Sequence, residues 1–577
     1  MKKVSLIFAL IFGSFYSNYS QAPIIENVTP TAQLISAPVN SNIVVNFNTK
    51  IAIESINDTS FKVFGRWSGP MMGSITLTEG DSTVQFIPDE PFFYGEWVVV
   101  SLSKGIESQD GLNLEFGYSW GFWTETMAGT LNQTVVDVIE VRLDGEGTIQ
   151  CYGAYAGDIN NDGYSDLSVV NEISNDIRLF LNDGQGGYSE FEIFNLPNGD
   201  TPSPNEGADF NADGVIDLAI ANTQNTQVSI LMGDGVEGYE PEVSYTADLR
   251  VRGIGILDAD GDGDDDIVTA NRSGNNMSLL LNDGSGVFAA PIHFETEGNN
   301  ETSLAVADAN GDGIMDAFVG AYTSQDIALM LGDGNGGFVF SDQVDVSGRP
   351  WMITVGDVNG DGFVDVVSAN STGNTASVIL GYGDGFMEEE VFYSSPGFPL
   401  AIDLGDIDGD GDLDMITSNY STAKYNLYEN DGFGNFSDPI VYDASTAGSC
   451  VILHDRDNDG DMDITGIDEV DDLIFIFEND STLTAVAELS QNPSGILGQS
   501  FPNPAKEWVT IDYNLPDNEP AVLIIYNPMG KIVLKFELNP SNNSITINVS
   551  ALKPGVYIYG ILINKTGTES RKTFVIE

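Results

Sequence analysis

The sequence predicts an all-β protein whose largest part is a seven-bladed β-propeller, and two observations point to that fold class. First, a nine-residue acidic loop occurs seven times between Asp158 and Asp463, and successive loops start 51, 49, 50, 49, 49 and 49 residues apart. Second, the stretches between the loops consist of short apolar segments and Gly-rich turns. Repeats of this length and composition are typical of propeller blades, each of which buries its faces against its neighbours.

Each repeat predicts four antiparallel strands. Within residues 350–400 these strands are expected at Met352–Val355, Val364–Ala369, Ala376–Gly381 and Glu389–Tyr393. The acidic loop therefore connects the first and second strands of a blade.

The last repeat is too short for four strands. After Asp463 only Ile464–Asp468 and Leu473–Glu478 have the pattern of strands. A lone strand at Val135–Leu143 lies upstream of the first loop at the distance expected of a fourth strand. We therefore expect Val135–Leu143 to close the ring by pairing with Leu473–Glu478, and Thr484–Leu489 is the competing candidate.

Smaller segments flank the propeller. Residues 22–125 lack the acidic loop and carry alternating apolar segments such as Ile43–Phe47, Thr83–Ile87 and Trp97–Leu102, which predict a small β-sandwich with its Trp residues in the core. Its deletion is expected to leave the propeller soluble. A basic start followed by an apolar run predicts a secretory signal peptide. The predicted organisation is a signal peptide at 1–21, the sandwich at 22–125, the propeller at 130–485, a linker at 486–500 and a small C-terminal β-sandwich at 501–577.

The residue types of the acidic loop predict a calcium site. Asp at positions one, five and nine and Asp or Asn at position three surround one point with hard oxygen ligands, while Gly at position six permits a sharp turn and residue seven offers its backbone carbonyl. Seven copies in register favour this interpretation over acidic turns braced by Asx hydrogen bonds, and a flexible protein oxygen shell suits calcium better than magnesium. The predicted ligands, about seven sites in all, are Asp158, Asn160, Asp162, Tyr164, Asp166, Asp209, Asn211, Asp213, Val215, Asp217, Asp258, Asp260, Asp262, Asp264, Asp266, Asp308, Asn310, Asp312, Ile314, Asp316, Asp357, Asn359, Asp361, Phe363, Asp365, Asp406, Asp408, Asp410, Asp412, Asp414, Asp455, Asp457, Asp459, Asp461 and Asp463.

The composition narrows the choice of partners. The chain has 87 acidic and 21 basic residues, and its formal net charge is −66. Nucleic acid is not expected as a partner, because no basic patch is available to neutralise phosphates. Basic residues are sparse and scattered along the sequence, which argues against a polysaccharide lyase, an enzyme that would need Lys, Arg, Tyr or His gathered at one calcium site.

Cysteine and histidine are rare. Cys151 and Cys450 precede the first and last loops, so they are a candidate disulfide between neighbouring blades, and two buried free thiols are the alternative. His293 and His454 are the only histidines and lie in no catalytic pattern; His454 is expected to be a packed strand residue. No catalytic residue is predicted.

A second repeated position lies thirteen residues after each loop start. It is expected on the propeller face opposite the loops, where amide groups would either bind glycans or adopt the left-handed turn conformation that Asn tolerates, and we favour the turn. The residues are Asn171, Asn222, Asn271, Ala321, Asn370, Asn419 and Asp468.

Three parts of the sequence resemble known families. The loops, from DINNDGYSD to DRDNDGDMD, resemble the FG-GAP and VCBS repeats of integrin α-subunits and bacterial secreted proteins, a resemblance that implies calcium in a propeller. The segment KGIESQDGLNLEFGYSWGFWT resembles the closing hairpin of a bacterial Ig-like domain. The succession PNP, MGK and LKPGVY resembles the C-terminal sorting domain of the type IX secretion system of Bacteroidota, which implies export by that machinery.

Together these expectations describe a secreted or cell-surface protein that does not span the membrane. It would be a calcium-stabilised propeller that acts as a binding or adhesion module for a protein or polysaccharide ligand. A lectin-like carbohydrate binder and a polysaccharide lyase or hydrolase are the alternatives.

Overall fold

The computed structural model describes residues 21–236, 238–479 and most of residues 497–577. These residues form two units, with a division between Ser481 and Thr482. Residues 1–20 of the predicted signal peptide and the alternative closing strand at 484–489 lie outside the described residues. Regular structure is almost entirely β, with two short 3-10 turns at Ile53–Ser55 and Tyr420–Thr422.

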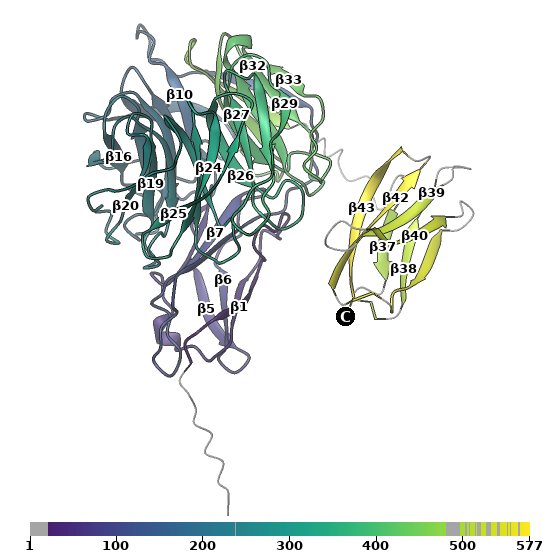
Figure 1. Cartoon of the computed structure of the whole chain (residues 1–577). Coiled ribbons are helices and arrows are strands. Elements are labelled where there is room, and N and C mark those ends of the chain that lie inside the picture. Colours follow the sequence, from purple (N-terminus) through teal and green to yellow (C-terminus); the bar gives the residue numbers. More distant parts are fainter. Residues whose placement is uncertain are drawn as a thin grey trace, which may run out of the picture. The chain divides into compact units, whose positions relative to one another are not determined.

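The first unit contains the propeller, whose blades are antiparallel four-stranded sheets (Figure 1). In order from strand one to strand four, the first six blades are β10 (Cys151–Gly157), β11 (Asp166–Asn171), β12 (Asp176–Asn182), β13 (Tyr188–Asn195); β14 (Pro202–Ala208), β15 (Asp217–Asn222), β16 (Gln227–Leu231), β17 (Val243–Thr246); β18 (Val251–Leu257), β19 (Asp266–Asn271), β20 (Asn276–Leu280), β21 (Ile292–Phe294); β22 (Glu301–Ala307), β23 (Asp316–Ala321), β24 (Asp326–Gly332), β25 (Phe338–Asp345); β26 (Pro350–Gly356), β27 (Asp365–Asn370), β28 (Thr375–Ile379), β29 (Val391–Ser394); and β30 (Pro399–Gly405), β31 (Asp414–Asn419), β32 (Lys424–Tyr428), β33 (Ile440–Asp443).

The seventh blade is completed by a strand from the other end of the propeller sequence. It consists of β34 (Gly448–His454), β35 (Asp463–Asp468), β36 (Leu473–Asn479) and β9 (Gln133–Glu140). The register runs from Leu473 opposite Glu140 to Asn479 opposite Gln133. The predicted ring closure is therefore confirmed.

Burial explains why the strands of a blade differ in composition. Every residue of the second strands is buried, as in the six residues Asp166–Asn171 of β11. The fourth strands are largely exposed to solvent, and β13 has exposed residues along much of its length. The first strands of neighbouring blades contact one another around the propeller axis. They run toward the acidic loops, so their starts lie on the opposite face.

A two-sheet sandwich precedes the propeller. One sheet has the order β1 (Ile25–Thr29), β2 (Ile43–Phe47), β6 (Thr83–Pro88) and β5 (Gly73–Thr78), and the other β4 (Gly69–Pro70), β3 (Phe61–Gly65), β7 (Trp97–Leu102) and β8 (Tyr118–Trp123). Trp120 and Phe122 lie in the core between the sheets, as the alternating pattern predicted.

The sandwich packs against one face of the propeller, as its purple strands in Figure 1 show. Trp67 joins the hydrophobic cluster of blades one, six and seven. Trp123 joins that of blades five and six, with Trp97 packed against it. The expectation that residues 22–125 are separable does not fit this packing, because their removal would expose apolar residues of the propeller.

The second unit contains two further sheets. One has the order β37 (Leu497–Phe501), β38 (Trp508–Tyr513) and β41 (Ser544–Asn548), and the other β40 (Ile532–Leu538), β39 (Ala521–Tyr526), β42 (Gly555–Ile563) and β43 (Thr566–Ile576). A hydrophobic cluster that includes Val509, Leu523 and Tyr559 forms its core. Its first strand begins inside the stretch expected to be a linker.

Among the described residues, no helix has the length and apolar character needed to cross a membrane.

Candidate metal centres and the mouth of the central channel

The acidic loops share one backbone conformation. Gly263 at position six has φ of 95°, a left-handed value that strongly favours glycine. Asp258 at position one accepts hydrogen bonds from the N–H groups of Asp262 (3.1 Å) and Gly263 (2.9 Å). Corresponding bonds to the glycine recur in the other loops. The turn thus folds the side chains of positions one, three and five toward one another.

Position nine of the loop has a bracing role. The Asp266 carboxylate accepts one hydrogen bond from the N–H of Ala259, at position two, and another from the N–H of Asn282, at the end of the third strand. The pattern repeats at Asp217 with Phe210 and Gly233. These buried carboxylates tie the loop to the blade, and the predicted ligand role of position nine stays a prediction.

Position three divides the loops into two kinds. In four loops an Asn amide donates to the position-five carboxylate, as Asn359 does to Asp361 at 3.0 Å. In the other three, carboxylate oxygens of positions one, three and five lie within 4.8 Å of one another. These clusters are Asp258, Asp260 and Asp262; Asp406, Asp408 and Asp410; and Asp455, Asp457 and Asp459.

The electrostatics of these clusters fit a divalent cation. One buried carboxylate oxygen of Asp406 and one of Asp455 have no hydrogen-bond partner among the described residues. Burial, with repulsion from neighbouring carboxylates, raises the pKa of Asp258 to about 7 and that of Asp455 to about 8. A calcium ion would hold such carboxylates ionised and fill the open oxygen positions.

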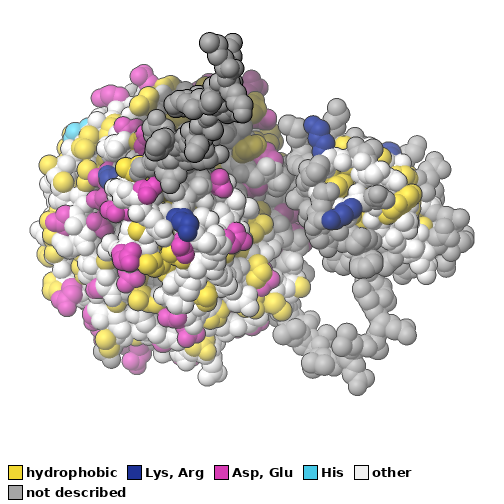
Figure 2. Space-filling view, turned by 90° about the horizontal axis from the view of Figure 1, so that it is seen from below, with side chains coloured by type: hydrophobic (Ala, Val, Ile, Leu, Met, Phe, Trp, Pro, Cys, Tyr) yellow, Lys and Arg dark blue, Asp and Glu magenta, His cyan; other side chains and the backbone are white. Residues whose placement is uncertain are grey.

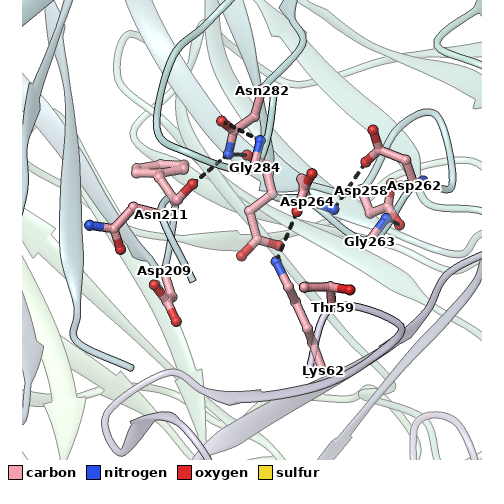
Figure 3. A network of polar contacts seen from close by, with 12 residues as sticks. Thr59, Lys62, Asp209, Asn211, Asp258, Asp262, Gly263, Asp264, Asn282 and Gly284 are labelled. Atoms are coloured by element: carbon pink, nitrogen blue, oxygen red, sulfur yellow. Dashed lines mark hydrogen bonds and ion pairs between the residues drawn. The ribbon is translucent and has the colours of Figure 1, made fainter. Parts of the chain in front are cut away.

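The sandwich covers the face on which the loops lie. Figure 3 shows Lys62 of β3 extending toward Asp264, with 3.6 Å between Nζ and a carboxylate oxygen. Burial opposes the charge of Lys62, but Asp265 and Asp264 raise its pKa above the ordinary value. A Cβ on Gly263 would lie 2.1 Å from the carbonyl oxygen of Thr59, so the sandwich backbone rests directly on this loop.

Four more loops make direct contact with the sandwich or the segment that follows it. The N–H of Asp158 donates to Trp67 at 2.7 Å, and the carbonyl of Gly313 accepts from Ser119 at 2.7 Å. In the last two loops, Thr126 donates to Asp406 at 2.8 Å and the carbonyl of Gly460 accepts from Met127. The loop face is therefore an internal interface of the first unit.

The opposite face carries the mouth of the central channel. Each first strand has a β-bulge near its start; in β10, Cys151 pairs with Asn171 and Gly153 with Val170, so that Tyr152 is the extra residue. Bulges redirect side chains, and here they place one residue per blade at the channel. We call this set the mouth ring: Tyr152, Ser203, Arg252, Thr302, Trp351, Leu400 and Ser449.

The mouth ring lines one end of a partly open cavity along the channel. The cavity has a volume of about 430 Å³ and is lined by the seven first strands and by sandwich residues such as Arg66, whose guanidinium lies 3.1 Å from Asp403. At the mouth, the Tyr152 hydroxyl accepts hydrogen bonds from Arg252 (2.6 Å) and Trp351 (2.5 Å). Three blades therefore meet above the channel.

Family comparisons agree with this architecture. Residues 158–466, more than half of the 577 residues, are covered by six overlapping matches to the FG-GAP-like repeat. The chain belongs to the FG-GAP-like repeat family. Residues 20–124 match the bacterial Ig-like domain, and residues 499–577 match the secretion system C-terminal sorting domain. This domain directs export by the type IX system to the cell surface or the extracellular space.

Solved structures with similar folds are distant in sequence. BBS1N in complex with ARL6DN is 12% identical, with TM-score 0.44 over 61% of this chain and 98% of that chain. An Agrocybe aegerita lectin that recognises non-reducing terminal N-acetylglucosamine is 20% identical, with TM-score 0.38 over 52% and 81%. The Dos1 propeller is 12% identical, with TM-score 0.38 over 74% and 97%. A search of curated proteins gave no match.

Two expectations about the face opposite the FG-GAP loops are wrong. The Asn residues thirteen positions after the loop starts are fully buried, so they present no ring of amides to a glycan. None of them has positive φ; Asn175 and Asn275, four residues further on, do. The Asn271 amide instead donates to Asn276 and Ser278, and so braces the turn from within the blade.

The sparse basic residues are also less scattered than expected. Arg250, Arg252, Arg272 and Arg349 come together beside the mouth ring. The sequence contains a signal for this site. The position six residues before each loop start varies from blade to blade, and Ser is the only residue type that occurs there twice. Residue type alone does not mark this position as a site, because no motif recurs there.

The cysteines and His454 are buried. Cys151 and Cys450 are free thiols in one hydrophobic cluster. Burial lowers the pKa of His454 to about 3, and its ring packs edge-on against Trp67. The expectation that His454 is a packed strand residue is confirmed.

The two kinds of FG-GAP loop predict different calcium affinities. Asp408→Asn removes one of three clustered carboxylates and should weaken calcium binding at its site by roughly tenfold, whereas Asn359→Asp should strengthen binding at its own. Calorimetric titration of both variants checks this, with Asp438→Asn, an exposed carboxylate of the same blade as Asp408, as control. Equal affinities in all three variants would contradict the prediction.

Proposed function

We propose that this exported protein is a calcium-stabilised binding module, with its ligand site at the channel mouth opposite the FG-GAP loops. A protein or polysaccharide at the cell surface or in the medium would be the partner. Calcium would be structural, because five of the seven candidate metal loops contact the sandwich or the segment that follows it and are not free to meet a large ligand.

The observation that carries this proposal is the contrast between the two ends of the channel. At the loop end, the seven blades repeat the same residue types, as a scaffold requires. At the mouth, equivalent positions hold Tyr, Ser, Arg, Thr, Trp, Leu and Ser. Such variety has no use in building identical blades and is typical of the convergent polar and aromatic groups of a binding site.

Titration properties favour binding over proton abstraction at this mouth. Burial is the main cause that raises the pKa of Tyr152 to about 12, so its hydroxyl stays protonated at neutral pH. His454, with a pKa of about 3, is buried within blade seven. An eliminating enzyme needs a base poised near the working pH.

The test is an array of neutral and acidic glycans and surface proteins, probed with the labelled full chain in calcium buffer. We expect a ligand whose signal is lost in Trp351→Ala, which removes a mouth aromatic, and kept in Lys50→Gln, an exposed sandwich residue. Binding that survives Trp351→Ala would place the site elsewhere. Absence of any ligand, or unsaturated products released from uronate polymers, would overturn the binding-module proposal.

The sorting domain predicts a clear defect in export. A chain that lacks residues 495–577 should fold but accumulate in the periplasm, because the second unit has its own core and carries the sorting signal. Fractionation followed by immunoblotting measures this distribution. Normal levels of truncated protein in the medium would contradict the assignment.

A further inference from the structure

Three of the basic residues at the mouth differ from all others in the first unit. Between Gln21 and Asn479 the sequence has twelve Lys and Arg residues. Nine of them form ion pairs with carboxylates. The other three of the twelve are Arg250, Arg272 and Arg349. They have no carboxylate partner among the described residues, and all three lie beside the mouth ring. Figure 2, which views the molecule from another side, shows magenta acidic groups spread over a surface with few dark-blue basic ones.

These arginines interleave with aromatic rings. The Arg272 guanidinium lies 4.6 Å from the centre of the Tyr322 ring and 5.6 Å from that of Trp351. Arg349 lies 4.6 Å from the same Tyr322 ring, and Arg252 lies 4.6 Å from Trp351. Stacking fixes the guanidinium planes and leaves their N–H edges available.

The donors of two of these guanidinium groups are not used within the protein. Neither Arg272 nor Arg349 makes a side-chain hydrogen bond to another described residue, although each side chain is partly buried. Each carries five N–H donors. Burial and repulsion from Arg252 and Arg250 lower the pKa of Arg272, and Arg272 has no ion pair with a carboxylate of the described residues.

The surroundings favour an acidic sugar over other anions. Hydroxyl groups of Thr223, Ser371 and Tyr420 occupy the same blade position as Arg272 and Tyr322. Next to Arg252, Glu172 and Glu469 offer acceptors for sugar hydroxyls, and Glu172 pairs with Arg252 at 3.8 Å. A mouth enclosed by seven blades suits the terminal residue of a glycan. The net charge of −66 repels a long polyanion that would lie along the outer surface.

We propose that the cluster formed by Arg250, Arg272, Arg349, Tyr322 and Trp351 binds the carboxylate of a terminal uronic acid residue. Guanidinium groups bind carboxylates through paired N–H···O bonds. The aromatic rings would hold the guanidinium groups in place beside the sugar. This inference rests on the proposed function and names its ligand class.

The test measures binding of tri-uronate oligosaccharides to the full chain by calorimetry, beside neutral oligosaccharides of equal length, sodium acetate and an acidic peptide. The double variant Arg272→Gln with Arg349→Gln should bind uronates at least about tenfold more weakly. Lys50→Gln, which removes one positive charge far from the mouth, should bind normally. Arg272→Lys, which keeps the charge but loses the planar fork, should bind more weakly than the wild type.

The outcomes separate this inference from the proposed function. Uronate binding lost in the double variant, with an unchanged melting temperature, supports both. A neutral glycan or acidic peptide that binds more tightly than uronates, and is lost in Trp351→Ala, overturns the acidic-sugar inference and keeps the binding site. Equal binding of acetate and uronates reduces the site to general anion binding and also overturns the inference. If none of the four probes binds and the array also yields no ligand, the proposed function itself is overturned.

Discussion

Removal of calcium with excess EGTA is expected to lower the melting temperature of the protein by roughly 10 °C or more, because several bound ions each contribute on the order of 3 kcal/mol when calcium is well above its dissociation constant. Without the ions, clusters such as Asp455, Asp457 and Asp459 bring three carboxylates within 4.8 Å of one another. Repulsion between them then opposes the folded loop.

Thermal unfolding followed by circular dichroism measures this effect. Calcium added back to the EGTA-treated protein should restore the original melting temperature, and magnesium at the same concentration should restore less of it, since magnesium demands a stricter octahedral shell. A melting temperature that EGTA does not change would show that the acidic loops are turns held by their own hydrogen bonds.

Loss of strand β9 is expected to cause aggregation of the protein. Replacing Gln133–Glu140 by a Gly/Ser segment of equal length removes the strand that pairs with β36 along its whole length. The buried residues Ile474 and Ile476 would then lie on an unpaired strand edge, which promotes association between chains. Size-exclusion chromatography should show aggregates in place of the wild-type peak.

The matched control keeps the strand and changes only exposed side chains. Val135 and Val138 are each 45% exposed, so Val135→Thr with Val138→Thr retains backbone pairing and β propensity. This variant should elute as the wild type does. A soluble, calcium-stabilised Gly/Ser variant that elutes as the wild type does would show that closure of the ring is made elsewhere.

The fold was predictable because its information is local and repeated. Loop sequence, strand alternation and the missing fourth strand of the last repeat were enough to predict the blades and the pairing of β9 with β36. The strand limits expected within residues 350–400 lie within two residues of those observed. Repetition helps because each blade solves the same packing problem.

The candidate binding site was not predictable in the same way. Arg252 and Trp351 lie far apart in sequence and meet Tyr152 only because blades one, three and five face one channel. A β-bulge turns each of them inward, against the two-residue alternation on which strand prediction depends. The contact between the sandwich and the loops could not be predicted for a related reason. Trp67 and Trp123 fit the alternation of a sandwich strand equally well whether their side chains face the sandwich core or the propeller.

The buried Asn residues show how one residue type misleads. Asn271 was expected to adopt a left-handed turn, because Asn is common there. In the structure it ends strand β19, and its amide donates to Asn276 and Ser278 inside the blade. The left-handed residue is Asn275, with φ of 53°, so the local propensity applied to a neighbouring Asn.

The number of calcium ions bound per chain tests the central claim most directly. Protein dialysed against buffer with low free calcium can be analysed for metal by mass spectrometry and for protein by amino-acid analysis. The seven acidic loops predict about seven calcium ions per chain, falling by one in a variant in which Asp357 and Asp361 are both changed to Asn. A chain that retains one calcium ion or none would contradict the account.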